Sequence, residues 1–227
     1  LQTVVDELKA FSYTVSHDLK SPLRAIKTYC NIILEEHNEN LDIDTNETLH
    51  NINNICSNMI IMIEKLLEYS RMAHLSINKE KVNISEMFSL TFEEYSSICP
   101  ERFIRFEFET GMPIVLADPV LIRQAIYNII SNAIKFTRNK EKALIIAGCK
   151  KGKGEYIFYV KDNGVGINME FSKKLFGIFQ RLHSSDEFEG NGIGLATVRK
   201  IIQRHGGRTW IEGKVNEGAV VYFTLPI

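Results

Sequence analysis

Residues 11–26, FSYTVSHDLKSPLRAI, set a single histidine, His17, inside a helical pattern, with Asp18 directly after it and Pro22 a little further along. Apolar residues recur around this stretch at the three- and four-residue intervals of a helix packed along one seam: Leu8, Phe11, Val15, Leu19, Leu23, Ile26, Cys30 and Ile33. His17 falls between these positions, and Pro22 removes one hydrogen bond from the helix nearby. The sequence therefore predicts a long helix over residues 1–37 that carries His17 on the flank of its seam.

A second helix with a broad apolar face follows a polar run, residues 37–44, that predicts a turn. Thr45 is its expected N-cap, with Thr48 at the position of the usual capping-box acid. Apolar residues then repeat to about residue 74, at Leu49, Ile52, Cys56, Met59, Ile63 and Leu66, and others widen the stripe: Ile55, Ile60, Ile61, Met62, Leu67 and Tyr69. This face is wider than one antiparallel helix covers. We therefore expect a helical hairpin that dimerises into a four-helix bundle, with a monomeric hairpin packed against the rest of the chain as the alternative.

The composition is that of an ordinary globular protein, with 44% hydrophobic and 24% charged residues among 227. The net charge of −1 gives no field that would attract nucleic acid. The four cysteines, Cys30, Cys56, Cys99 and Cys149, lack C-x-x-C spacing, which argues against a disulfide framework or a zinc site and favours a reducing cytoplasm. Because Leu1 already lies in a helical pattern and no signal peptide or long apolar run is present, we expect a further region upstream, with a membrane tether there as an open alternative.

The pattern changes after a polar link at residues 78–81, where alternating strand and helix signals begin. We therefore expect an α+β chain of two domains, residues 1–77 as the helical hairpin and residues 78–227 as an α/β sandwich. Ser85 is the expected cap of the first helix of the second domain, and Asp118 with Pro119 gives the next one a strong start signal. The expected helices cover residues 85–98, 119–133, 171–179 and 193–205, and the expected strands cover residues 82–84, 103–108, 114–116, 144–149, 156–160, 209–212 and 219–224.

The helix that follows Asp118 carries a polar face, with Asn128 and Asn132 one turn apart and Lys135 close by. Neutral amide oxygens suit a Mg²⁺ ion that keeps several waters and phosphate oxygens, and Lys135 adds a positive charge on the same side. Two asparagines in a helix more often mean only a polar surface. This segment therefore indicates a phosphate and metal site only in combination with others.

Two glycine-rich loops follow. In DNGVGI, residues 162–167, the Asp162 carboxylate at a strand end can accept from an exocyclic amine, and the glycines let the backbone approach a flat ring; a simple turn is the alternative. In GNGIGL, residues 190–195, the loop leads into a helix whose free N–H groups can face phosphate oxygens. Between them, FGIFQR at residues 176–181 precedes a polar loop, residues 184–190, with the composition of a mobile lid.

The string SHDLKSPL, residues 16–23, closely resembles the H box of sensor histidine kinases, whose histidine accepts a phosphoryl group. The order H box, asparagine box, DxGxG, phenylalanine box and GxGxG resembles the catalytic core of that family over essentially the whole chain. The runs FQRLHSSDEFEGNGIGLA and HGGRTWIE look like the phytochrome-type branch. The second domain is similar to the ATPase domains of gyrase, heat-shock-90 and mismatch-repair proteins.

The resemblance implies ATP and Mg²⁺ as ligands, with Asp162 on the adenine amine, Asn132 and Asn128 on the metal, and Lys135 near the phosphates. It assigns the pocket and its lid to Gly164, Gly166, Phe179, Arg181, Gly190, Gly192, Gly194 and Leu195. Some residues depart from the commoner pattern: Asp18, Lys20 and Asn191 are mild replacements. Ser21 stands where many relatives carry the Thr or Asn tied to phosphatase activity, so that second activity stays open.

The function implied by the resemblance is ATP-dependent autophosphorylation of His17, with Asp18 hydrogen-bonded to the other ring nitrogen, in a homodimer regulated by an upstream sensor region. The phosphoryl group would pass to an aspartate of a response-regulator receiver domain. An ATP-driven clamp without phosphohistidine is one alternative; it needs a catalytic glutamate where Asn128 stands. A non-catalytic dimerisation module with a vestigial ATP site is the other.

Overall fold

The computed structural model describes two compact units, Leu1–Leu75 and Ser76–Ile227, whose boundary falls two residues before the expected one. The described residues are 2–36, 41–72, 76–98, 102–109, 111–172, 174–180, 187–188 and 190–227, and their side chains are described from residue 18 onward except at residues 97 and 98. No helix in the described part of the chain is long and apolar enough to cross a membrane.

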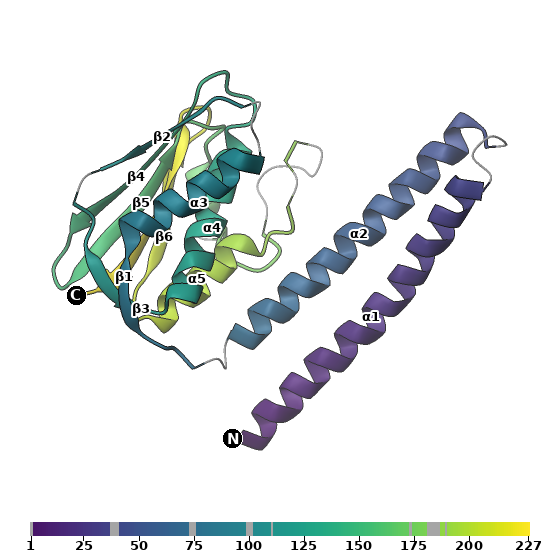
Figure 1. Cartoon of the computed structure of the whole chain (residues 1–227), viewed down its shortest axis with the longest axis horizontal. Coiled ribbons are helices and arrows are strands. Elements are labelled where there is room, and N and C mark those ends of the chain that lie inside the picture. The colour runs from purple at the N-terminus through teal and green to yellow at the C-terminus, as the bar shows by residue number, and fades with distance from the viewer. Residues whose placement is uncertain are drawn as a thin grey trace. The chain divides into compact units, whose positions relative to one another are not determined.

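The first unit is a hairpin of two long helices, α1 (Gln2–Glu36) and α2 (Ile43–Met72) (Figure 1). Helix α1 continues through Pro22, as the sequence pattern predicts. The expectation that Thr45 caps α2 is wrong. The helix begins at Ile43, and the side-chain oxygen Oδ1 of Asp42 accepts the backbone N–H of Thr45 at 2.6 Å, so the cap lies inside the polar run that precedes the predicted start.

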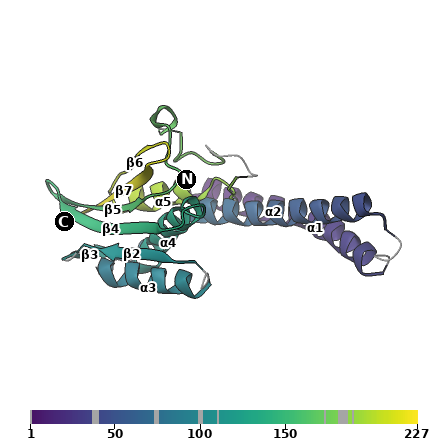
Figure 2. The same ribbon diagram turned by 90° about the horizontal axis from the view of Figure 1, so that it is seen from above.

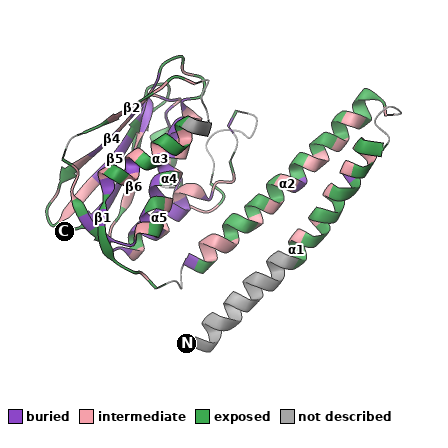
Figure 3. Ribbon diagram, viewed as in Figure 1, coloured by how far each residue is buried: buried purple, intermediate pink, exposed green. Residues whose placement is uncertain are grey.

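Few side chains of the hairpin are buried (Figure 3). Among its described side chains these are Cys30, Cys56 and Met72, and Asn53 Nδ2 donates to Asn31 Oδ1 at 2.5 Å between the helices. The predicted seam of α2 is therefore split: Ile52 and Ile63 are half-buried with Cys56, whereas Met59 and Leu66 are exposed. The exposed apolar side chains of α2 recur at helical spacing, at Ile55, Met59, Met62 and Leu66.

The second unit is a sheet covered by helices on one face (Figures 1 and 2). Its five-stranded sheet has the order β2-β4-β5-β7-β6, in which β2 and β4 are parallel and the other pairs antiparallel, and β1 pairs with β3 as a separate ribbon. The helices are α3 (Ile84–Ile98), α4 (Pro119–Phe136) and α5 (Gly194–Arg204). The strands are β1 (Glu80–Asn83), β2 (Ile104–Phe108), β3 (Ile114–Ala117), β4 (Ala143–Lys151), β5 (Glu155–Asp162), β6 (Thr209–Lys214) and β7 (Gly218–Pro226).

Three details of this unit differ from the prediction. Helix α4 extends to Phe136, three residues beyond the expected end, because its C-terminal turn is also buried and capped. The cap of α3 is Asn83 rather than Ser85, since Asn83 Oδ1 accepts from the N–H of Glu86 at 3.3 Å. The helix expected over residues 171–179 is replaced by the 3₁₀ turn Met169–Phe171 and further turns, and the positive φ of 62° at Phe179 is incompatible with a right-handed helix.

The core of the second unit lies between α4, α5 and the sheet. Four isoleucines of α4, at 122, 126, 129 and 130, are almost fully buried. Facing them, Phe158 of β5 and Phe223 of β7 stack with ring centroids 5.1 Å apart, and both are inaccessible to solvent. Burying each such side chain stabilises the fold by about 1.5–3 kcal/mol, so this layer fixes α4 against the sheet.

The start of α4 is fixed by a buried cluster around Asp118. Its Oδ1 accepts from the N–H groups of Val120 and Leu121, its Oδ2 accepts from Asn78, and its own N–H donates to Nε2 of His205 at 3.0 Å. The other ring nitrogen of His205 lies 2.8 Å from the Ile201 carbonyl and donates to it, so the ring is neutral. Burial alone would raise the pKa of Asp118, but the three backbone donors outweigh it and lower that pKa.

We predict that His205→Ala destabilises the second unit by about 1–3 kcal/mol, because it leaves the buried N–H of Asp118 without an acceptor. Burial lowers the pKa of His205, so its contribution is complete above the unfolded-state pKa of about 6.5 and declines as the pH falls below it. Urea unfolding followed by fluorescence of Trp210, the single tryptophan, measures this unit. Gln203→Ala, at an exposed position of α5, should unfold like the unmodified chain; an equal loss there would contradict the assignment.

Candidate functional site

The C-terminal half of α4 brings the predicted asparagine face against the second glycine loop. A β-carbon at Gly194 would lie 3.6 Å from Asn128 Oδ1 and 3.9 Å from Asn132 Nδ2, and one at Gly190 would lie 3.1 Å from Lys135 Nζ. All three side chains of α4 are half-buried. The two segments, far apart in the sequence, therefore form one wall of polar groups around the start of α5.

The end of α4 is held by an arginine that the sequence analysis did not single out. Arg102 Nη1 donates to the Ile134 carbonyl at 2.9 Å and Nη2 to the Thr137 carbonyl at 2.8 Å. The buried hydroxyl of Thr137 donates to the Ala133 carbonyl at 2.8 Å. A cation and a hydroxyl thus satisfy carbonyls that a helix end leaves open, which keeps the polar turn of α4 ordered. No local pattern around Arg102 signals this contact.

Asp162 is the last residue of β5, and its side chain is buried. Burial raises its pKa to about 6, although the N–H groups of Gly164 and Ala219 donate to it and act in the opposite direction. The bond from Gly164 to Oδ1 is 2.8 Å long. Because the folded state binds the proton more tightly than the unfolded chain, ionising this carboxyl reduces stability as the pH rises from about 4 to 6. A ligand that donates a hydrogen bond to it would offset that cost.

The first glycine loop is pressed against α4 and the β6–β7 turn so closely that side chains do not fit. A β-carbon at Gly164 would lie 2.5 Å from the Phe136 carbonyl oxygen, and one at Gly166, where φ is 70°, would lie 1.9 Å from the Lys214 carbonyl oxygen. Asn163 anchors the loop, since its Oδ1 accepts from Leu144 N at 2.9 Å. The loop is therefore a fixed wall beside Asp162.

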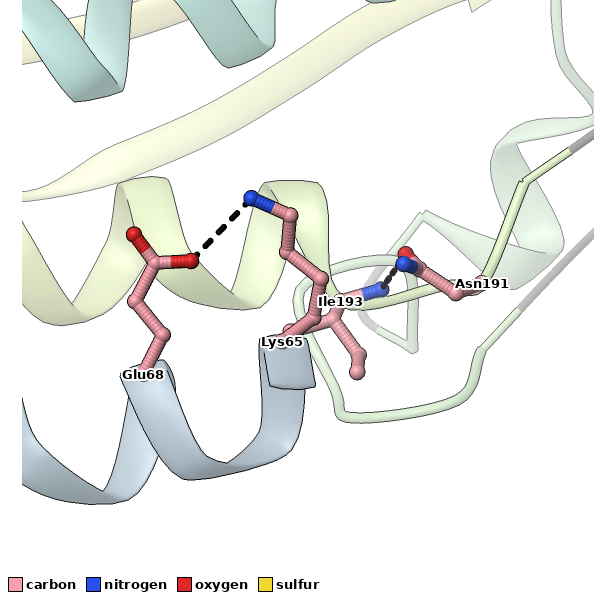
Figure 4. A network of polar contacts seen from close by, with 4 residues as sticks. All are labelled: Lys65, Glu68, Asn191 and Ile193. Atoms are coloured by element: carbon pink, nitrogen blue, oxygen red, sulfur yellow. Dashed lines mark hydrogen bonds and ion pairs between the residues drawn. The ribbon is translucent and has the colours of Figure 1, made fainter. Parts of the chain in front are cut away.

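The second glycine loop leads directly into the first turn of α5. Gly192 has a φ of 68°, and its carbonyl accepts from Phe179 N at 3.0 Å. Asn191 Oδ1 accepts from Ile193 N at 3.3 Å (Figure 4), and Ile193, the N-cap of α5, makes no side-chain cap hydrogen bond within the described part of the chain. Leu195 lies half-buried in the first turn of α5. An uncapped helix start of this kind presents donors and a positive dipole end to an anion.

Part of the predicted lid is described. Phe179 is 48% exposed, whereas Phe188 is buried with its ring centroid 5.2 Å from that of Phe136. The guanidinium of Arg138 lies 4.9 Å from the Phe188 ring and donates to the Glu187 carbonyl. Phe188 and Arg138 were not predicted, because a polar stretch gives no sign that one aromatic residue turns inward. Residues 181–186 and 189, including Arg181, lie outside the described part.

The predicted phospho-acceptor lies in the hairpin. His17 belongs to α1, and its side chain is outside the described set, while Asp18 next to it is exposed. One turn further, Lys20 Nζ forms an ion pair with Glu64 Oε1 of α2 at 2.9 Å. On α2 itself, Lys65 pairs with Glu68 at 3.1 Å (Figure 4). The described side chains that follow His17 on α1 are therefore polar at Asp18 and Lys20, whereas Leu19, which the sequence pattern assigns to the seam, is 51% exposed.

Neither unit contains, within its described residues, a cluster of His, Cys, Asp and Glu able to hold a metal ion. The predicted ligands are the amides Asn128 and Asn132, which form no such cluster. The Oδ1 of Asn128 and the Nδ2 of Asn132 lie nearest to the start of α5, and Lys135 lies near Gly190. This donor set suits a hydrated divalent ion that is shared with an anionic ligand rather than one bound by the protein alone.

Two family models match successive parts of the chain. The His Kinase A (phospho-acceptor) domain matches residues 7–75, and the histidine kinase-, DNA gyrase B- and HSP90-like ATPase family matches residues 117–227. The first covers the hairpin with His17, and the second covers α4, both glycine loops and β4 to β7. The order of the two matches is the order that the sequence resemblance implied.

Known proteins give the same assignment. The chain is 36% identical to cyanobacterial phytochrome A of Nostoc sp. (strain PCC 7120 / SAG 25.82 / UTEX 2576), over 97% of this chain and 29% of that protein. Its fold is similar to that of ShkA full-length in complex with AMPPNP (TM-score 0.70, 22% identity, 96% of this chain, 45% of the other). It also matches the catalytic domain of histidine kinase ThkA (TM-score 0.55, 26% identity, 67% and 96%). The two family models, with the likenesses to the phytochrome and to ThkA, show that the chain belongs to the sensor histidine kinase family.

Proposed function

We propose that the chain binds ATP in its second unit and transfers the γ-phosphoryl group to His17 of the hairpin. The observation that carries this proposal is the convergence of both glycine loops on α4, the first at its C-terminal end and the second at its asparagine face, beside the buried carboxylate of Asp162. A dinucleotide fold is not supported, because the GxGxG loop here is not part of a βαβ unit. The chain spans 29% of the length of the phytochrome that it matches, so other segments of such a protein can regulate this activity.

Each side of the site suits one part of ATP. The Asp162 carboxylate would accept the adenine amine, and the loop at Gly164 and Gly166, held by its packing on Phe136 and Lys214, would form the wall beside the ring. The open start of α5 and Lys135 receive the phosphates. Asn128 and Asn132 would hold Mg²⁺, which when bound neutralises charge on the phosphate oxygens. Phe179, which is exposed, would cover the bound nucleotide.

In the proposed reaction a ring nitrogen of His17 attacks the γ-phosphorus. A P–N bond forms as the bond to the oxygen bridging the β- and γ-phosphates breaks, and ADP leaves with the electron pair. Asp18 accepts a hydrogen bond from the other ring nitrogen, which orients the imidazole and supports its positive charge. The phosphoryl group then passes to an aspartate of a receiver domain on a separate response regulator.

We predict that His17→Gln abolishes self-labelling from γ-labelled ATP without changing ATP affinity, because the nucleotide site belongs to the other unit. His50→Gln replaces an exposed histidine of α2 and serves as the matched control, which should label normally. The measurement is the acid-labile, alkali-stable label retained on the protein. Label of that kind in the His17 variant would refute its role as acceptor.

We predict that Asp162→Asn weakens ATP binding roughly tenfold or more at pH 7.5, because one amide oxygen cannot serve Gly164, Ala219 and adenine together. In the unmodified chain the affinity should also fall as the pH drops through about 6, where the Asp162 carboxyl takes up its proton. Calorimetry at several pH values measures both effects. Because the ATP phosphates titrate equally in both experiments, subtracting the binding free energy of the variant from that of the unmodified chain removes their contribution. Identical pH profiles would exclude the adenine contact.

We also propose that the hairpin forms a homodimer. The apolar stripe of α2 at Ile55, Met59, Met62 and Leu66 is exposed, and Leu19, Ile26 and Tyr29 of α1 are exposed as well. Monomeric proteins rarely leave so continuous an apolar surface in water. A second hairpin that buries these faces gives a four-helix bundle, the arrangement expected from the width of the stripe.

We predict that Met59→Lys together with Met62→Lys yields a monomer, since charges at an apolar seam cannot be buried without compensation. These two side chains are exposed in the single hairpin, so its own packing should survive, which helical circular dichroism checks. Glu47→Lys with Asn54→Lys, at exposed polar positions of α2, is the matched control and should stay dimeric. Light scattering gives the mass of each; a monomeric unmodified chain at micromolar concentration would rule out the bundle.

A further inference from the structure

A groove in the second unit, separate from the site described above, runs between α5 and the end strand β6. Its volume is about 470 Å³, and none of the residues that line it is acidic. Its lining includes Arg199 and Gln203 of α5, Phe176, and Arg208 and Trp210 at β6. Two guanidinium groups beside apolar rings favour a ligand that is both negatively charged and partly apolar.

The groove follows the unpaired edge of β6. The sheet order places β6 at the end, with β7 as its one strand neighbour in the described chain. Residues 209–211 line the groove consecutively, and because successive side chains of a strand point to opposite faces, the surface they share is the strand edge. Thr224 N donates to the Arg208 carbonyl, so by antiparallel alternation the backbone groups of Thr209 and Ile211 point away from β7, toward the groove.

The two arginines are placed to meet acidic groups on both sides of that edge. Arg199 is exposed on the helix side. Arg208 lies 4.8 Å from the Trp210 ring and pairs with Glu155 at 2.7 Å, an exposed ion pair that contributes little and that another carboxylate can replace. Trp210 is held rigid by stacking on Tyr222, with centroids 4.8 Å apart. In addition, Thr209 Oγ1 is buried without a hydrogen bond among the described residues.

We propose that this groove, the β6-edge groove, is a docking site for an extended acidic peptide segment of another protein, which adds as a strand beside β6. A small anion would satisfy the arginines but leave the N–H and C=O groups of Thr209 and Ile211 unmet, whereas a peptide backbone repeats donors and acceptors at the strand spacing. Adjacent acidic residues of the peptide point to opposite faces, one toward Arg199 and one toward Arg208. The proposal does not depend on the kinase activity.

The test uses a fluorescein-labelled Val-Thr-Val-Glu-Asp-Val-Thr-Val peptide and the full chain, with binding followed by fluorescence anisotropy. Two further peptides separate the contributions: one carries lysines in place of the two acids, and one keeps the acids but has alternate backbone nitrogens methylated, which blocks strand pairing. Arg199→Glu reverses one charge of the groove. Lys153→Glu, in the exposed β4–β5 turn, makes the same charge change at a residue that does not line the groove.

We expect saturable binding of the acidic peptide to the unmodified chain and to Lys153→Glu, and binding weaker by roughly tenfold or more for both altered peptides and for Arg199→Glu. Trp210 fluorescence should change on binding, since the indole lines the groove. The absence of saturable binding up to about 1 mM peptide would overturn the proposal. Equal binding of the methylated peptide would also overturn it, because attraction between charges alone would then explain the contact.

Discussion

The hydrogen bond from the N–H of Asp118 to Nε2 of His205 sets the position of α4, and most of the second unit depends on that helix. It joins the start of α4 to the end of α5, two elements that are distant in the chain. Arg102 holds the other end of α4 through the carbonyls of Ile134 and Thr137. With both ends fixed and its isoleucines buried, α4 presents Asn128, Asn132 and Lys135 in one direction, toward the start of α5.

The site combines a rigid glycine loop with polar groups whose hydrogen-bonding capacity the protein itself does not fully satisfy. The glycine loop at residues 163–166 is packed so tightly on α4 and the β6–β7 turn that it cannot give way. Beside it, burial destabilises the ionised form of Asp162 more than the hydrogen bonds from the N–H groups of Gly164 and Ala219 stabilise it, so the pKa of this carboxyl is raised. A ligand that donates a hydrogen bond to this carboxylate stabilises its ionised form. The folded protein without ligand is therefore less stable than the folded protein with ligand bound. The uncapped start of α5 is a second group of this kind.

The two units differ in how they bury their apolar surface. The second has a closed core between helices and sheet, with Phe158 and Phe223 at its centre. The hairpin, by contrast, leaves much of its apolar surface exposed, including Met59, Met62 and Leu66. The second unit therefore needs no partner to close its core, whereas the proposed homodimer would bury the exposed stripe of the hairpin.

The sequence by itself determined the helical hairpin, the change to alternating strands and helices, and the position of Asp162 at a strand end, because these follow from local periodicity and turn chemistry. The sequence-based predictions were wrong at three places. Asp42 and Asn83, which lie shortly before the expected cap residues, cap α2 and α3 instead, and turns replace the helix expected at residues 171–179. Only the tertiary structure decided that Arg102 and His205 hold α4, that Phe188 turns inward, and that the edge of β6 faces two arginines. These contacts join residues far apart in sequence, and no short-range pattern encodes which distant backbone group a buried side chain will satisfy.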